Sequence, residues 1–200
     1  MNIQAPLLTK PCAMPLSRTL ATAGMAALLA ISIAGCGKSK SWATRDLTDL
    51  TVETPYVVGP GPDVKASLPQ QVRDSMEYFE TLDTGDGTNP RVMVSRMAGK
   101  PGIAMSLDGA TNGAMNGGIS SLGKATGETV NPKFTTSSLK IDGLEARKAS
   151  YTGQAKGKSV HLDGVFVQKG QKVWQVQVIT LGDSSAADIA RIVDSVHIKP

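Results

Sequence analysis

The chain contains few of the residues from which metal centres, disulfides and nucleic-acid surfaces are built. Its 200 residues include two cysteines, two histidines and eight aromatic residues. The histidines, His161 and His197, lack a second ligand at metal-binding spacing, so we expect neither a zinc nor a copper site and no cofactor. No basic run is interleaved with aromatic residues, so we do not expect nucleic-acid binding.

The longest apolar stretch without charge runs from Thr19 to Ala34, directly after Arg18. As a helix its 16 residues would span about 24 Å, which is short of the ~30 Å hydrocarbon core of a bilayer. A basic residue, a short apolar run and small residues at its end are typical of a signal peptide. A transmembrane anchor is the less favoured interpretation.

The end of this run has the pattern of a lipobox, Ile33-Ala34-Gly35-Cys36: an aliphatic residue, two small residues and a cysteine. The motif predicts that the Cys36 thiol receives diacylglycerol and that the chain is cleaved between Gly35 and Cys36. Acyl chains on Cys36 would then hold the protein on a membrane. The membrane can be the cell membrane or the outer membrane. In a cell with two membranes, the sorting pattern usual for lipoproteins favours the outer one, facing the periplasm, when Gly37 rather than an aspartate follows the cysteine.

Cleavage also determines the composition of the mature chain. Removing residues 1–35 leaves 165 residues, which suits one domain. Cys12 leaves with the signal and the lipid occupies Cys36, so no disulfide can form. Lys10 and Arg18 also leave, while all 17 acidic residues stay, and the net charge falls from +4 to +2. We expect residues 36–46 to be an acylated N-terminus and flexible tether, and residues 47–200 to be a single domain.

The second half of the chain has the clearest strand pattern. The predicted strands are 130–141, 144–152, 159–168 and 172–181, separated by Asp142-Gly143, residues 153–158 and Gly170-Gln171. Dipeptides such as Asp-Gly favour tight antiparallel hairpins. In the last strand, alternation places Trp174, Val176 and Val178 on one face, which favours a core role for Trp174 over ligand stacking.

Further elements are predicted on both sides of this region. Strands are expected at 47–58, interrupted by Pro55, and at 78–82 and 91–97, with loops at 59–62 and 99–102. Short helices are expected at 69–76, with Pro69 at its first position, and after Ser185, which begins a capping box. The apolar stripe of the last helix comprises Ile189, Ile192, Val193 and Val196.

Residues 106–122 have helical spacing of apolar residues but contain many glycines. Ser106 suits the N-cap, and Gly109, Gly113 and Gly117 recur every fourth residue along one stripe. Each glycine costs the helix up to ~1 kcal/mol relative to alanine. We expect the stripe to allow close approach of the helix to a sheet; the alternative is a helix that faces a partner protein.

Motifs that would indicate catalysis are weak. Leu82-Asp83-Thr84-Gly85 matches the short signature of aspartic proteases, but a second copy is missing from the chain. Glycines at 85 and 87 occupy positions where a calcium loop needs oxygen ligands, so an ordinary hairpin turn is favoured. A Ser-His-Asp triad is defined by geometry and stays open, although no nucleophile elbow is present.

Two stretches resemble a known family: the hairpin at 166–176, Phe-Val-Gln-Lys-Gly-Gln-Lys-Val-Trp-Gln-Val, and the ending at 192–198, Ile-Val-Asp-Ser-Val-His-Ile. The order of elements at the end of the chain resembles the PsbP-like and DcrB-like α/β/α sandwich found in bacterial lipoproteins: a late antiparallel hairpin, then a helix, then a short terminal strand. The resemblance covers residues 47–199. It implies a binding or assembly module, without a catalytic motif that could be transferred.

Together these patterns predict an α+β fold with a central antiparallel sheet flanked by helices. The expected function is that of a lipid-anchored cell-envelope protein, a non-enzymatic module that binds an envelope protein partner. One alternative is a periplasmic carrier of a small ligand or lipid, which would need an apolar cavity near Trp174 or the glycine stripe. The other is a hydrolase of unrecognised type, which would need a cluster of polar side chains in a cleft.

Overall fold

The structure is a computed structural model that describes residues 42–55, 59–60, 70–83, 91–99, 105–127, 129–155, 157–182 and 186–200. The predicted signal peptide, the lipobox with Cys36 and the first part of the tether lie outside these ranges. So do residues 84–90, which contain most of the turn after Asp83, and Ser185 of the predicted capping box.

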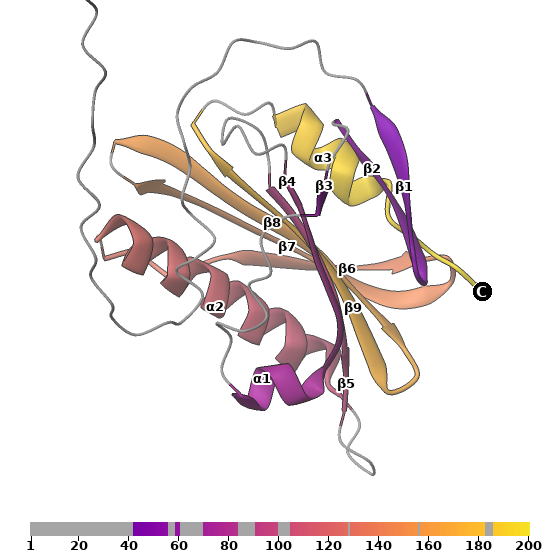
Figure 1. The fold of residues 1–200 in the computed structure, drawn as a ribbon. Coiled ribbons are helices and arrows are strands. Elements are labelled where there is room, and N and C mark those ends of the chain that lie inside the picture. Colours follow the sequence, from indigo (N-terminus) through magenta and orange to yellow (C-terminus); the bar gives the residue numbers. More distant parts are fainter. Residues whose placement is uncertain are drawn as a thin grey trace, which may run out of the picture.

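Three helices and ten strands make up the described part of the chain (Figure 1). In chain order they are β1 (Ala43–Leu47), β2 (Leu50–Thr54), β3 (Gly59–Pro60), α1 (Gln70–Ser75), β4 (Met76–Asp83), β5 (Arg91–Ala98), α2 (Leu107–Thr126), β6 (Thr135–Ile141), β7 (Leu144–Ala155), β8 (Lys158–Lys169), β9 (Lys172–Leu181), α3 (Ala186–Asp194) and β10 (His197–Ile198).

The strands form two antiparallel sheets. The large sheet has the order β3-β4-β5-β9-β8-β7-β6, and the small sheet has the order β1-β2-β10. Helix α2 covers one face of the large sheet over β7 and β8, while α3 and the small sheet cover the other face (Figure 1). This arrangement confirms the predicted α+β class with helices on both sides of a central antiparallel sheet. None of the helices in the described ranges is both long and apolar enough to cross a membrane.

Each face of the large sheet has its own hydrophobic core. The core under α3 and the small sheet includes Trp174, Val176 and Val178, as the alternation in β9 predicts. The predicted apolar stripe of α3 packs against the same face, with Ile189, Ile192, Val193 and Val196 buried. The core under α2 is built from Met115, Ile119, Leu122, Leu162 and Phe166, among others.

The predicted hairpins of the second half form, although the first strand begins at Thr135 and not at residue 130. At the β6–β7 turn Asp142 and Gly143 both adopt positive φ, at 50° and 79°, which matches a two-residue hairpin turn. Asp142 also accepts a hydrogen bond from the backbone N–H of Ile198 at 2.7 Å and contacts His197 Nδ1 at 3.2 Å. The hydrogen bond from Ile198, followed by that from His197, lowers the pKa of Asp142 below its usual range. The turn therefore binds the terminal strand of the small sheet.

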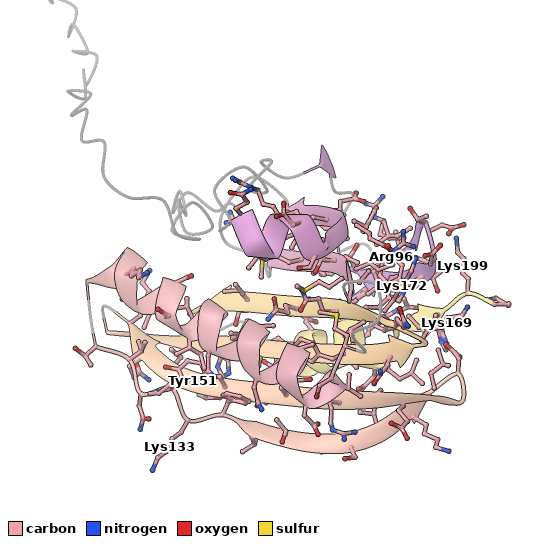
Figure 2. The ribbon with its side chains drawn as sticks, turned by 90° about the horizontal axis from the view of Figure 1, so that it is seen from below. Arg96, Lys133, Tyr151, Lys169, Lys172 and Lys199 are labelled. Carbon is pink, nitrogen blue, oxygen red and sulfur yellow. The ribbon has the colours of Figure 1, made fainter. Side chains whose placement is uncertain are left out.

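A group of ion pairs lies where β5 ends and β9 begins, and Figure 2 shows Arg96, Lys169, Lys172 and Lys199 close together there. Arg96 pairs with Asp49 of the β1–β2 turn and, at 2.9 Å, with Glu77. Lys172 also contacts Glu77, at 2.9 Å. The pair with Asp49 joins the small sheet to β5 of the large sheet, whereas the two pairs with Glu77 link β4 to β5 and β9 within the large sheet.

The N-terminal part differs from the sequence prediction. Instead of one strand at 47–58, residues 43–54 form a hairpin, β1 and β2, with its turn at Thr48-Asp49. Residues 43–46 therefore belong to a sheet and not to the flexible tether. The turn contains neither glycine nor proline, and Asp49 alone is a weak turn signal.

Two predicted loops also differ. Gly59 and Pro60 form a short edge strand beside β4, where proline is tolerated because an edge strand can leave its missing N–H on the open side. The break predicted at 153–158 is much shorter, because β7 continues to Ala155 and pairs there with Lys158. Gly157 supplies the positive φ of 72° that this tight turn requires.

Candidate functional site

The candidate binding site is the outer face of α2. The helix begins as predicted at Ser106, whose hydroxyl accepts a hydrogen bond from the backbone N–H of Gly109 at 3.2 Å. It ends at Gly127, which adopts a left-handed conformation with φ 72°. The charges of Asp108 in the first turn and Lys124 in the last turn both complement the helix dipole.

The glycines of α2 do not have the role that their spacing predicts. Gly118, which lies outside the stripe, is the one that approaches the sheet: a Cβ there would lie 2.6 Å from Cδ2 of the buried Leu162. Gly109 and Gly113 of the stripe are exposed, and a Cβ on Gly113 would meet nothing within 4 Å. Gly109 and Gly113 therefore face away from the sheet and Gly117 is half-buried, so the expectation that the stripe permits helix–sheet packing is wrong.

A groove lies beside the second half of this face. Its volume is about 400 Å³, and it separates Ile119, Ser120 and Gly123 of α2 from Val130 and Pro132 of the segment that leads into β6. Ile119 is buried and forms part of the core under α2. Asn116 and Lys124 also line the groove, so the apolar floor has a polar margin. The groove and the exposed stripe form a continuous surface through Asn116 and Ser120, which are both exposed on α2.

A polar cluster lies on the opposite face of the sheet, on β7 and β8. Asp163 is 9% exposed and accepts a hydrogen bond from the hydroxyl of Ser150. His161 lies on the same face of β8, and its Nδ1 is 3.3 Å from Thr152 Oγ1. The serine hydroxyl contacts the aspartate and not the histidine, so these three residues lack the order of contacts of a Ser-His-Asp triad.

Burial raises the pKa of Asp163, despite the opposing effects of Ser150, His161 and Lys148. Because the folded-state pKa is above the unfolded value, the free energy of unfolding should fall as the pH rises from about 4 through the folded-state pKa of Asp163. Asp163→Asn should remove this fall while keeping an acceptor for Ser150. Urea unfolding of both proteins from pH 4 to pH 8 measures the effect, and parallel pH profiles would contradict it.

Trp174 occupies a filled part of the other core. Its side chain is 2% exposed, the Tyr78 ring lies 5.8 Å from it between centroids, and the Arg96 guanidinium lies 4.9 Å above it. This packing confirms the core role and leaves the indole ring inaccessible for stacking on a ligand. Within the described ranges, no group of three or more histidine, cysteine, aspartate or glutamate residues is placed to hold a metal ion.

Comparison with known proteins supports the fold. No family model matches the sequence, and no curated protein matches it. Among solved structures, the PsbP protein of the cyanobacterium Synechocystis matches with a TM-score of 0.51 at 13% identity, over 84% of this chain and 97% of that one. The chain therefore has a PsbP-like fold.

Two further structures are less similar. LpqN, described as involved in cell envelope biogenesis of Mycobacterium tuberculosis, matches with a TM-score of 0.42 at 14% identity, over 82% of this chain and 87% of that one. A Bacteroides thetaiotaomicron protein also has a TM-score of 0.42, at 11% identity over 76% of this chain, and this chain covers only 45% of that protein.

Proposed function

We propose that the chain is a lipid-anchored cell-envelope protein, held by acyl chains on Cys36, that acts without catalysis by binding a partner protein through the outer face of α2. The lipobox supports the anchor, and the glycine stripe of α2 supports the binding face. Gly109 and Gly113 lower the intrinsic stability of the helix, and neither is needed for packing within the described part of the chain.

The stripe suits a helix of the partner. Side chains four residues apart form ridges on a helix, and ridges of one helix pack into grooves of another. The absence of side chains at 109 and 113 deepens one such groove along α2, which is 20 residues long. A helix of the partner could approach closely there and place an apolar side chain over Ile119 in the adjacent groove.

Charge also favours this occupant. The only charged residues of α2 are Asp108 and Lys124, one near each end. The face between them carries small neutral side chains, which include Asn112, Asn116 and Ser120. A helix with a neutral, apolar stripe therefore fits better than a charged or extended segment.

The experiment is site-specific photo-crosslinking in intact cells. A photoreactive residue at Asn116, an exposed position of α2 beside the stripe, should give one discrete crosslinked product, which mass spectrometry identifies. The same residue at Gln154, an exposed position on β7, is the matched control and should not give it. Identical products from both positions, or none from position 116, would contradict the proposal.

A second variant tests the geometry of the contact. Gly113→Phe fills the stripe without meeting any atom of this chain at its Cβ, so the domain should remain folded. The partner identified by crosslinking is purified separately, and its affinity for the variant should be at least about tenfold lower than for the wild type. The added ring would overpack the interface, as an enlarged side chain overpacks a core. Unchanged affinity would show that the partner does not approach α2 closely.

A further inference from the structure

A second groove lies on the outer side of the small sheet. Thr44, Thr51 and Glu53 form one wall, and Arg191, Asp194 and Ser195 at the end of α3 form the other, with His197 between them. The volume of this anchor-side groove is about 320 Å³. Figure 1 shows α3 beside β2 and β1 at this place.

The anchor-side groove holds charges of both signs in fixed positions. The Arg191 Nε donates to Glu53 Oε2 at 2.7 Å, and its guanidinium lies 4.0 Å above the Trp42 ring. Asp194 accepts from Lys148 Nζ at 2.8 Å. These contacts use Nε of Arg191 and one carboxylate oxygen each of Glu53 and Asp194. The two Nη atoms of Arg191 and the second oxygen of each carboxylate can therefore form hydrogen bonds with a ligand.

Hydrogen bonds also tie the wall on α3 to β2. The Ser195 hydroxyl accepts from the backbone N–H of Glu53 at 2.8 Å and donates to the carbonyl of Ile192 at 2.8 Å. Arg191 and Asp194 are three residues apart and so lie on the same side of the helix. A cationic and an anionic group therefore face the anchor-side groove side by side.

The position of this groove relative to the anchor limits what can reach it. Trp42 lies six residues after Cys36, a distance of at most about 20 Å in an extended chain. This step rests on the proposed acylation of Cys36. With Cys36 in the bilayer, the groove beside Trp42 stays within reach of the lipid headgroups.

We propose that the anchor-side groove binds a phosphoethanolamine headgroup. The phosphate would accept hydrogen bonds from the Arg191 guanidinium, and the ammonium would donate to Glu53 and Asp194. An anionic headgroup brings no cation for the second carboxylate oxygens of Glu53 and Asp194. A phosphocholine headgroup has no N–H to donate and is usually bound by aromatic rings, whereas Arg191 covers the Trp42 ring.

The test uses the full chain in uncharged maltoside micelles and follows backbone amide signals by NMR. Titration with glycerophosphoethanolamine should shift the amides of Thr44, Glu53 and Ser195 with saturation. Glycerophosphocholine, glycerophosphoglycerol and inorganic phosphate should each bind at least tenfold more weakly. If inorganic phosphate bound as tightly as glycerophosphoethanolamine, the groove would be a site for free phosphate and the proposal would be wrong. The same affinity for all four probes, or amide shifts that lie outside the groove, would also overturn it.

Two variants with a matched control locate the site. Arg191→Gln and Asp194→Asn should each weaken glycerophosphoethanolamine binding about tenfold. Arg147→Gln is the control and should leave binding unchanged. Arg147 also pairs with a carboxylate at 2.7 Å, as Arg191 does with Glu53, but its partner Asp108 lies on α2, on the other face of the large sheet. Since the probe is soluble, the titration does not depend on acylation. If Cys36 is acylated but the groove does not bind glycerophosphoethanolamine, the headgroup site is refuted and the anchor stands. If the groove binds it with saturation but Cys36 is not acylated, the anchor is refuted and the headgroup site stands.

Discussion

Trp174→Ala is expected to lower the free energy of unfolding by about 3–5 kcal/mol, the usual range for removing a buried tryptophan side chain. Trp174 lies on β9, between β5 and β8 in the large sheet, and is 2% exposed. Its loss would leave the Tyr78 ring and the Arg96 guanidinium facing an empty volume. For a domain of this size the melting temperature should fall by roughly 10 °C.

Trp42→Ala is the matched control. Trp42 is only partly buried at the margin of the same core, so its removal should lower the free energy of unfolding by about 1–2 kcal/mol. Equal losses for the two variants, measured by urea unfolding, would show that Trp174 is not central to the core.

Gly118→Val is expected to destabilise the fold by about 1–3 kcal/mol through overpacking. The new Cβ would lie 2.6 Å from Cδ2 of Leu162, which is completely buried and has little room to move. Gly113→Val introduces the same side chain into the same helix, where nothing lies within 4 Å of the Cβ. Because valine has the higher helix propensity, Gly113→Val should stabilise the protein by a few tenths of a kcal/mol.

The difference between these two variants isolates the packing of α2 on the sheet, since propensity contributes similarly at both positions. Thermal unfolding followed by circular dichroism measures it. Equal melting temperatures would contradict the placement of Gly118 against β8.

Much of the fold could be predicted from the sequence where local signals agree with tertiary packing. Strands β6 to β9 lie in the part of the chain with the clearest strand pattern, and turns such as Asp142-Gly143 carry the residues that positive φ requires. The apolar stripe of α3 and the N-cap of α2 are local patterns of the same kind. Their helices lie where the sequence predicts them.

The remaining features depend on contacts between distant segments. The β1–β2 hairpin turns at Thr48-Asp49 and is held by partners such as Arg96, which lies 47 residues beyond Asp49. The spacing of the α2 glycines shows that they share a face, but only the packing shows which face meets the sheet. The anchor-side groove joins β1, β2, α3 and β10, whose residues form no recognisable motif in the sequence.

The proposed lipid anchor on Cys36 determines where the protein acts, because an acylated residue 36 would keep Trp42 and the anchor-side groove within reach of the bilayer. The most direct test is the intact mass of the protein extracted from membranes, for the wild type and for Cys36→Ser. The wild-type chain should begin at Cys36 and carry added acyl mass, which the variant should lack. An unmodified Cys36 in the membrane-extracted wild type would contradict the lipid anchor.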